Sequence, residues 1–287
     1  MTMWYIIDQI LIAVGLVIFL LVLLAGLDFY KLIRVSAHWR PCARLYTKQP
    51  TLFIHGYRGN RYSFGHLLGR LQKAGIAKKS MVIWVGRNGR LHVDGDAALQ
   101  ANNPTIQVLF ANNRADVQDQ VRWLATIIEH LKEAYGVTQV NLVGHSMGAI
   151  TVLRYLLTSD HAVVDKVILL AAPVNDPSIG PDTPLVFWSE LTSRGPVKRT
   201  RNYNYLAVRA KYFPTAISVL NIAGELLGTN RHDGSVAVDS SFALRSLLKG
   251  HVCHYQEMLV RGPGGAHSML HENRLVDQAI DDFLWRD

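Results

Sequence analysis

The chain has 287 residues, of which 49% are hydrophobic and 18% charged, with a formal net charge of +8 and two cysteines. This length allows one large or two small domains, and the apolar content excludes a disordered chain. Cys42 and Cys253 are too few for a disulfide framework and lack metal-ligand spacing. The basic residues form no dense run with interleaved aromatics, so we expect no nucleic-acid partner.

The chain begins with an apolar segment. Residues 10–27, ILIAVGLVIFLLVLLAGL, are uncharged and as a helix would span about 27 Å, close to one bilayer crossing. A cleavable signal peptide is the alternative, but it usually starts with basic residues and has a shorter apolar centre. No Lys or Arg precedes this run and no convincing cleavage site follows it. We therefore expect a retained single-pass anchor with the membrane as a partner.

Residues 28–50 indicate a basic juxtamembrane connector. One acid in this segment, Asp28, is outnumbered by five basic residues, namely Lys31, Arg34, Arg40, Arg44 and Lys48. Because all of them follow the apolar run, the positive-inside rule favours a cytoplasmic location for the rest of the chain. The expected division is an anchor and connector over 1–50 and a catalytic domain over 51–287.

In the first half of this domain, residues 51–57 (TLFIHGY) predict a short buried strand. Asn88-Gly89 between two apolar stretches predicts a β-hairpin, and IQVLF at 106–110 predicts another strand. Between residues 117 and 131 apolar side chains recur every three or four positions, and Gly136 follows as a stop signal. That spacing predicts an amphipathic helix.

The second half continues the alternation of strands and helices. We expect strands at 139–143, 166–172, 217–224 and 253–260, and helices at 147–157, around 242–248 and at the C-terminus. Continuous apolar strands between helices are typical of an α/β fold with a mostly parallel sheet that is covered on both faces. Residues 173–213 break the pattern, since Pro, Gly, Ser and Thr mix there with Phe187, Trp188, Tyr203, Tyr205, Tyr212 and Phe213.

The stretch VNLVGHSMGAITV, residues 140–152, contains a candidate nucleophile. Ser146 lies between Gly144 and Gly148, with a predicted strand before it and a helix after it. This is the G-x-S-x-G pattern of a nucleophile elbow, in which close strand–helix approach leaves no room for a β-carbon at either flank. The serine hydroxyl would then lie beside the free N–H groups of a helix N-terminus. The alternative is a serine N-cap in an ordinary loop.

Candidates for the acid and the base follow in the chain order serine, acid, histidine. Asp233 comes after the strand that ends near residue 224, and His267 comes after the last strand and a Gly-Pro-Gly-Gly loop. The histidine would take the serine proton while the carboxylate fixes its tautomer. Asp233 also fits a structural turn before glycine. Asp176, after the strand that follows the elbow, and Asp239 are alternative acids.

Two further histidines, His271 and His55, lie within the motif regions. His271 lies four residues after His267, and on a helix the two would share a face. We expect His271 to be a supporting or helix-capping residue. We also expect His55 to support its loop structurally and to have no catalytic role.

The motifs FIHGYRGN, VGHSMG, RHDGSV and AHSMLHEN occur in that order. In this combination the chain resembles α/β-hydrolases of the lipase and esterase type over residues 51–287, and within them the DUF915-like bacterial membrane-anchored or surface hydrolases. The resemblance implies the α/β-hydrolase fold and an oxyanion hole formed by the backbone N–H groups of Tyr57 and Met147. Gly56 would let the backbone approach the substrate. A cell-surface location, as in such families, conflicts with the charge rule.

The expected function is a membrane-anchored serine hydrolase that cleaves carboxylic esters through an acyl-enzyme intermediate, without metal or other cofactor. Residues 173–213 would form a cap whose aromatics give an apolar pocket for medium or long acyl chains. An acyltransferase with the same three residues and a non-catalytic binding module on this fold are the alternatives. The natural acyl group and the oligomeric state stay open.

Overall fold

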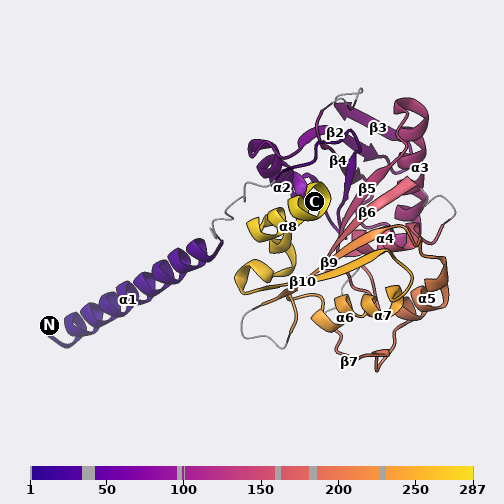
Figure 1. Cartoon of the computed structure of the whole chain (residues 1–287). Helices are drawn as coiled ribbons and strands as arrows, with labels where there is room; N and C mark the ends of the chain where they lie inside the picture. Colours follow the sequence, from indigo (N-terminus) through magenta and orange to yellow (C-terminus); the bar gives the residue numbers. More distant parts are fainter. Residues whose placement is uncertain are drawn as a thin grey trace.

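The computed structural model has an eight-stranded sheet with helices on both faces, which confirms the predicted α/β architecture (Figure 1). All neighbouring strands of this sheet pair in parallel except β2 and β3, which pair antiparallel. The spatial order is β10-β9-β6-β5-β1-β4-β2-β3. The structure describes residues 2–33, 43–95, 99, 101–158, 163–180, 186–226 and 231–286.

The strands of the sheet have the following bounds: β1 Thr51–Ile54, β2 Lys78–Val85, β3 Leu91–Gly95, β4 Pro104–Phe110, β5 Val140–His145, β6 Val164–Leu170, β9 Ser218–Glu225 and β10 His254–Arg261. Every residue of β1, β4 and β5 is buried, as expected for central strands covered on both faces. The turn between β2 and β3 contains Asn88-Gly89, where Gly89 has a φ of 78°. The predicted hairpin is therefore present.

Two pairs of helices enclose the sheet (Figure 1). α2 (Arg61–Lys73) and α8 (Arg274–Trp285) share one apolar core with one face of the sheet. α3 (Val117–Tyr135) and α4 (Met147–Tyr155) share another core with the opposite face. The burial of apolar side chains on both faces is the main source of stability of such a layered fold.

The helix predicted from the spacing at 117–131 is α3, which continues to Tyr135. Its first turn is capped because the side chain of Asp116 accepts a hydrogen bond from the Asp119 amide at 2.8 Å. It ends at Gly136, which adopts the left-handed conformation with a φ of 64°. Local signals thus define both ends of this helix.

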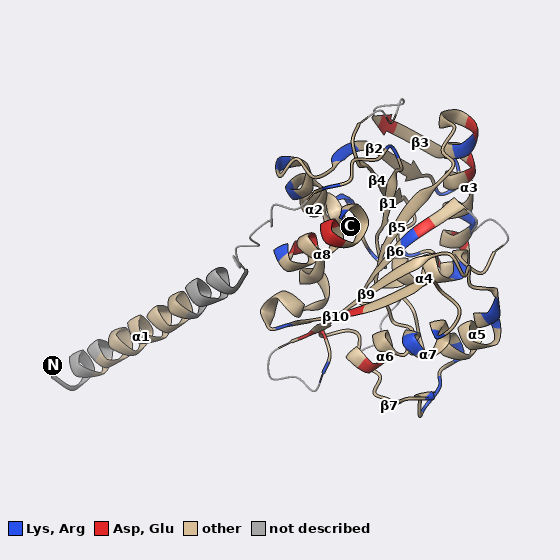
Figure 2. Ribbon diagram, viewed as in Figure 1, with Lys and Arg blue, Asp and Glu red and all other residues tan. Residues whose placement is uncertain are grey.

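The helix α2 was not predicted, although it anchors α8. Its Arg70 makes two hydrogen bonds to the Asp277 carboxylate, at 2.6 and 2.9 Å, and a third to Glu272 at 3.0 Å. Figure 2 shows the basic residues of α2 near acidic residues of the C-terminal segment. Asn60 and Ser63 form a capping box at the start of α2.

The long connection over 173–213 has its own small elements. They are the two-stranded pair of β7 (Leu191–Thr192) and β8 (Gly195–Pro196), the helix α5 (Arg201–Arg209) and the 3₁₀ helix η2 (Ala210–Tyr212). Residues 181–185 of this predicted cap lie outside the described residues. The helix predicted around 242–248 consists of two short helices, α6 (Val238–Phe242) and α7 (Leu244–Leu248).

The prediction of a single-pass anchor over 10–27 is wrong. The first helix is α1 (Thr2–Ile33), but among the described residues no helix is both long and apolar enough to cross a membrane. The single-pass membrane localisation predicted from this anchor is therefore wrong as well. Residues 34–42 of the predicted connector lie outside the described residues.

Candidate active site

The candidate residues gather at the carboxyl ends of the parallel strands, the edge at which open α/β sheets bind their ligands. Each comes from the segment that follows a different strand. In chain order these are Gly56 and Tyr57 after β1, Ser146 after β5, Asp176 after β6, Asp233 after β9 and His267 after β10.

Ser146 has the strained backbone of a nucleophile elbow. Its φ of 55° and ψ of −124° lie in a region that residues other than glycine rarely adopt. Its amide donates a 2.8 Å hydrogen bond to the Leu170 carbonyl, which holds the turn against β6. A β-carbon on Gly144 would lie 2.7 Å from the Ala149 Cα, and one on Gly148 would lie 2.6 Å from the His55 carbonyl oxygen. Both glycines are therefore required by close packing, as the motif predicts.

The His267 side chain lies within hydrogen-bonding distance of both Ser146 and Asp233. The Ser146 Oγ is 3.0 Å from the His267 Nε2, and the His267 Nδ1 is 2.7 Å from an Asp233 Oδ2. His267 begins the 3₁₀ helix η4 (His267–Glu272), and its amide donates to the Asp233 carbonyl at 2.8 Å. The Gly-Pro-Gly-Gly loop before it forms the 3₁₀ helix η3 (Pro263–Gly265).

The Asp233 carboxylate is fixed from both sides. It is 2% exposed, and its Oδ1 accepts hydrogen bonds from the amides of Ser235 at 2.8 Å and Val236 at 2.7 Å. Its Oδ2 is thereby directed at the imidazole. An ionised carboxylate accepts the Nδ1–H of His267, which leaves the Nε2 lone pair free to accept the Ser146 hydroxyl.

The alternative acids do not contact His267. Asp176 accepts a hydrogen bond from the Ser240 hydroxyl at 2.7 Å, and Asp239 forms an ion pair with Arg231 at 3.2 Å. Burial raises the pKa of Asp176 to about 6, although the Ser240 hydrogen bond opposes the rise. His271 is not in the position of His267, because its Nδ1 donates to Glu272 at 3.2 Å.

His55 supports the loop that follows β1. It is 1% exposed, its Nδ1 donates to the Gly56 carbonyl at 2.7 Å, and its Nε2 accepts from the Phe110 amide at 3.1 Å. Burial lowers its pKa, so it is neutral at pH 7. This is the structural role expected for it. A β-carbon on Gly56 would lie 2.9 Å from the Ser146 Cβ, so the loop runs directly beside the serine.

His145 is a site residue that sequence reasoning missed. Its Nε2 donates to the backbone carbonyl of His267 at 3.0 Å, and the two rings lie 4.7 Å apart. Burial holds its pKa well below the ordinary value, so it is a neutral donor. Its place in the elbow motif, directly before Ser146, was the signal that could have identified it.

Two cavities meet at Ser146 and His267. One of about 300 Å³ is also lined by Tyr57, Met147 and Asp176, and one of about 400 Å³ extends towards Tyr62 and Glu272. As the first residue of α4, Met147 has an N–H without an acceptor inside its own helix. An oxyanion hole at Tyr57 and Met147 stays a prediction. None of the six aromatic residues of the segment 173–213 lines either of these two cavities.

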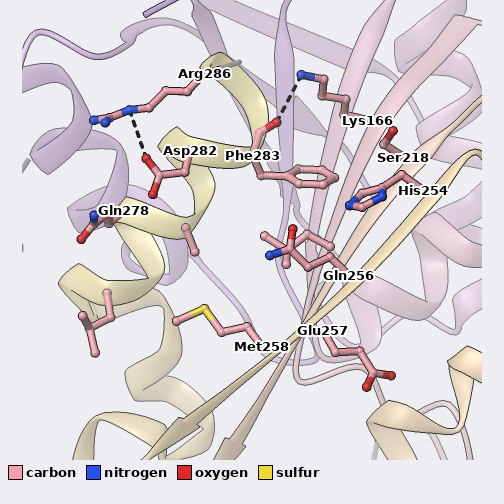
Figure 3. Close-up of a pocket in the computed structure, with 13 residues that line it drawn as sticks. Lys166, Ser218, His254, Gln256, Glu257, Met258, Gln278, Asp282, Phe283 and Arg286 are labelled. Atoms are coloured by element: carbon pink, nitrogen blue, oxygen red, sulfur yellow. Dashed lines mark hydrogen bonds and ion pairs between the residues drawn. The ribbon is translucent and has the colours of Figure 1, made fainter. Parts of the chain in front are cut away.

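A larger cavity of about 630 Å³ lies at the opposite edge of the sheet, between the strands β9 and β10 and the helix α8 (Figure 3). Its charged groups are engaged in the fold. Lys166 Nζ donates to the carbonyls of Phe283 at 3.2 Å and Leu284 at 3.1 Å, and Arg286 pairs with Asp282 at 3.1 Å. Within the described parts of the chain, no group of three or more His, Cys, Asp or Glu side chains is placed to hold a metal ion.

A mostly parallel sheet with helices on both faces and a strained serine between β5 and α4 defines the α/β-hydrolase fold. The chain belongs to the family described as alpha/beta hydrolase of unknown function (DUF915), whose profile matches residues 42–287. The resemblance inferred from the sequence motifs is thereby confirmed.

Two solved structures are similar over most of the chain. The product of the gene lin2722 from Listeria innocua is 27% identical with a TM-score of 0.74, covering 83% of this chain and 94% of that one. A protein from Lactobacillus plantarum described as a cell surface hydrolase is 25% identical with a TM-score of 0.67, covering 85% of this chain and 92% of that one. A comparison with curated proteins found no match.

Proposed function

We propose that the protein is a serine hydrolase that cleaves carboxylic esters through an acyl-enzyme intermediate. The observation that carries this proposal is the pair of hydrogen-bonding distances, 3.0 Å between Ser146 and His267 and 2.7 Å between His267 and Asp233. A nucleophile within reach of a base that is itself oriented by a third group is the general signature of covalent hydrolysis. Membership of an α/β-hydrolase family supports the same reaction class.

In the first half-reaction, the Ser146 Oγ attacks the ester carbonyl carbon while its proton passes to the His267 Nε2. The tetrahedral intermediate then collapses, and the protonated imidazole gives its proton to the leaving alcohol as the C–O bond breaks. In the second half-reaction, His267 takes a proton from water as the water attacks the acyl-enzyme. The bond between the acyl carbon and the Ser146 Oγ then breaks, His267 returns the proton to this oxygen, and the acid leaves. Asp233 stays ionised throughout and stabilises the imidazolium.

The negative charge on the carbonyl oxygen would be stabilised by the backbone N–H groups of Tyr57 and Met147. Both residues line the cavity that contains Ser146 and His267. Such preorganised donors strengthen their interaction as charge develops, and the loss of one costs about 10²–10³ in rate. Gly56 contributes by allowing the loop of Tyr57 to approach the serine.

The test is covalent labelling together with ester turnover. We expect a fluorophosphonate to label the protein and p-nitrophenyl esters to be hydrolysed. Ser146→Ala should abolish the labelling and lower turnover by several orders of magnitude, to about 10³-fold above the rate in water. Ser218→Ala, at the opposite edge of the sheet, is the matched control. Normal labelling of a folded Ser146→Ala variant would disprove the assignment of the nucleophile.

A further inference from the structure

Asp176 is a buried carboxylate with one oxygen that the fold does not use. The residue is 4% exposed, and its Oδ2 accepts the Ser240 hydroxyl at 2.7 Å. Ser240 in turn accepts a hydrogen bond from the Asn175 amide at 3.0 Å. Within the described part of the chain, Asp176 has no second hydrogen-bond donor, and it lines the 300 Å³ cavity together with Ser146.

The proposed hydrolytic mechanism gives Asp176 no role. Asp233 already orients His267, and its two oxygens are engaged by His267 and by two amides. Burial of a carboxylate is costly, because it removes part of the water that would solvate the charge. Its pKa of about 6 reflects this cost. Incompletely satisfied ionisable groups in a cavity are a common mark of ligand binding.

Part of the remaining lining is also polar, beside the apolar residues Met147, Pro173, Ile179 and Val236. Besides Asp176 the cavity is lined by Arg58 and by the hydroxyl-bearing residues Ser178 and Ser235. The Arg58 guanidinium lies 5.4 Å from the centre of the Tyr57 ring. A long acyl chain would have to cover these groups without forming hydrogen bonds. A hydroxyl can donate a hydrogen bond to a carboxylate, whereas the positive charge of Arg58 disfavours a cationic ligand.

We propose that Asp176 is a substrate-binding residue that accepts a hydrogen bond from a hydroxyl group of the ester, so that the substrates are hydroxyl-bearing esters. This inference rests on the proposed function and defines the substrate class of the same site. The hydroxyl can belong to the acyl group or to the alcohol, and both lie near the scissile bond.

The experiment compares pairs of esters that differ by one group. In the first arm, p-nitrophenyl esters with a hydroxyl on the second or third acyl carbon are paired with analogues in which a methyl replaces the hydroxyl. In the second arm, the monoacetate of a diol is paired with the acetate of the alcohol in which a methyl replaces the free hydroxyl. In one of the two arms we expect kcat/KM to favour the hydroxyl by at least about tenfold, as for a hydrogen bond to a charged group.

Variants separate binding from structural support. Asp176→Ala should reduce the preference to about one, and the isosteric Asp176→Asn, which keeps an acceptor oxygen, should retain part of it. Asp239→Asn is the matched control, because Asp239 is paired with Arg231 and does not line the cavity. It should leave the preference unchanged. If Asp176→Ala fails to fold, Asp176→Asn and the preference of the unmodified protein still decide the question.

Equal rates within both pairs would overturn the inference while leaving the hydrolase intact. An equal loss of activity on all substrates in Asp176→Ala and Asp176→Asn, with an unchanged preference, would also overturn it and assign Asp176 to structural support. Absence of Ser146-dependent hydrolysis and labelling would instead contradict the proposed function.

Discussion

At the scale of single residues, Asp233 determines which nitrogen of His267 faces Ser146. Replacing it by Asn would place an amide NH₂ opposite the His267 Nδ1, which favours the tautomer with the proton on Nε2. That nitrogen could no longer accept the serine proton. We expect Asp233→Asn to fold normally and to lower kcat on a p-nitrophenyl ester by about 10⁴-fold.

The comparison for this prediction is Asp176→Asn on the same substrate, because Asp176 is the alternative acid. Because Asp176 bonds to Ser240 and does not contact His267, its replacement should cost far less in kcat. If Asp176→Asn were inactive and Asp233→Asn active, the catalytic acid would be Asp176 and not Asp233.

Asp176 should also make stability depend on pH. Its pKa of about 6 in the folded protein lies above the ordinary 3.8, mainly because of burial, with the nearby Asp233 adding and the Ser240 hydrogen bond and His267 opposing. The folded state therefore binds more protons than the unfolded state between about pH 4 and 6, and stability falls as pH rises through this window. The difference between 3.8 and about 6 corresponds to a loss of about 3 kcal/mol in the free energy of unfolding above pH 6.

Asp176→Asn removes this titration. Its free energy of unfolding, relative to the unmodified protein, should therefore be higher at pH 7 than at pH 4, by up to about 3 kcal/mol. Urea unfolding at the two pH values measures this difference, with Asp239→Asn as the control. A difference that does not change with pH would show that Asp176 carries no such penalty.

The sequence identified Ser146, Asp233 and His267 as neighbours because the hydrolase motifs occur in a characteristic chain order. It did not identify the contact of His145 with the His267 carbonyl or the open oxygen of Asp176. Both features depend on which atoms are buried together in the fold. The two contacts join residues that are 122 and 64 positions apart in the chain, so they leave no local sequence pattern.

At the scale of helices and strands, the ion pair between α2 and α8 is open to a direct test. Arg70→Met would leave the Asp277 carboxylate, which is fully buried, without its partner. Removing one partner of a buried ion pair lowers the free energy of unfolding by about 3–5 kcal/mol. Adding Asp277→Asn should restore much of this loss. Guanidinium unfolding of the single and double variants measures both effects.

The control for this pair is Arg122→Met on α3. Arg122 pairs with Asp119 on an exposed surface, so its loss should cost less than about 1 kcal/mol. Equal costs for Arg70→Met and Arg122→Met would contradict the view that burial of Asp277 makes the α2–α8 contact important.

The elements differ in how far the sequence predicted them. The spacing, cap and stop signals of α3 are all local, and its prediction was accurate to within a turn. α2 contains Gly65 and Gly69, which weaken its helical signal, and it is held by Arg70 contacts with α8 that are distant in the chain. The aromatics of 173–213 were expected to line an acyl pocket, but Tyr203 and Phe213 are buried in the main core.

At the scale of the whole molecule, the sequence predicted a parallel sheet but not the order of its strands. Alternating buried strands and helices define the layers. The order β10-β9-β6-β5-β1-β4-β2-β3 depends on long-range contacts. That order matters for function because it places β5 between β1 and β6, so that Ser146 lies between the loop of Gly56 and Asp176.

The start of the folded domain is a second property of the whole molecule. Arg44 makes two hydrogen bonds to the buried Asp281, at 2.8 and 2.9 Å, and the Leu45 amide donates to the Trp285 carbonyl at 2.8 Å. The side chain of Asn103, fully buried, accepts from the Thr47 amide at 2.9 Å. The short segment 43–50 thus ties the C-terminal helix to the region before β4, although the sequence predicted a boundary at residue 51.

Truncation distinguishes the two boundaries. A chain of residues 43–287 should keep these contacts, whereas a chain of residues 51–287 loses them and leaves the polar side chain of Asn103 without part of its partners. We expect the shorter chain to unfold at a lower urea concentration, with a loss of about 3 kcal/mol, since several buried hydrogen bonds and one side of an ion pair disappear. Asp281 retains Arg286, which limits the loss. Arg44→Met in the 43–287 chain should reproduce part of the effect, and equal stability of the two chains would place the boundary at residue 51.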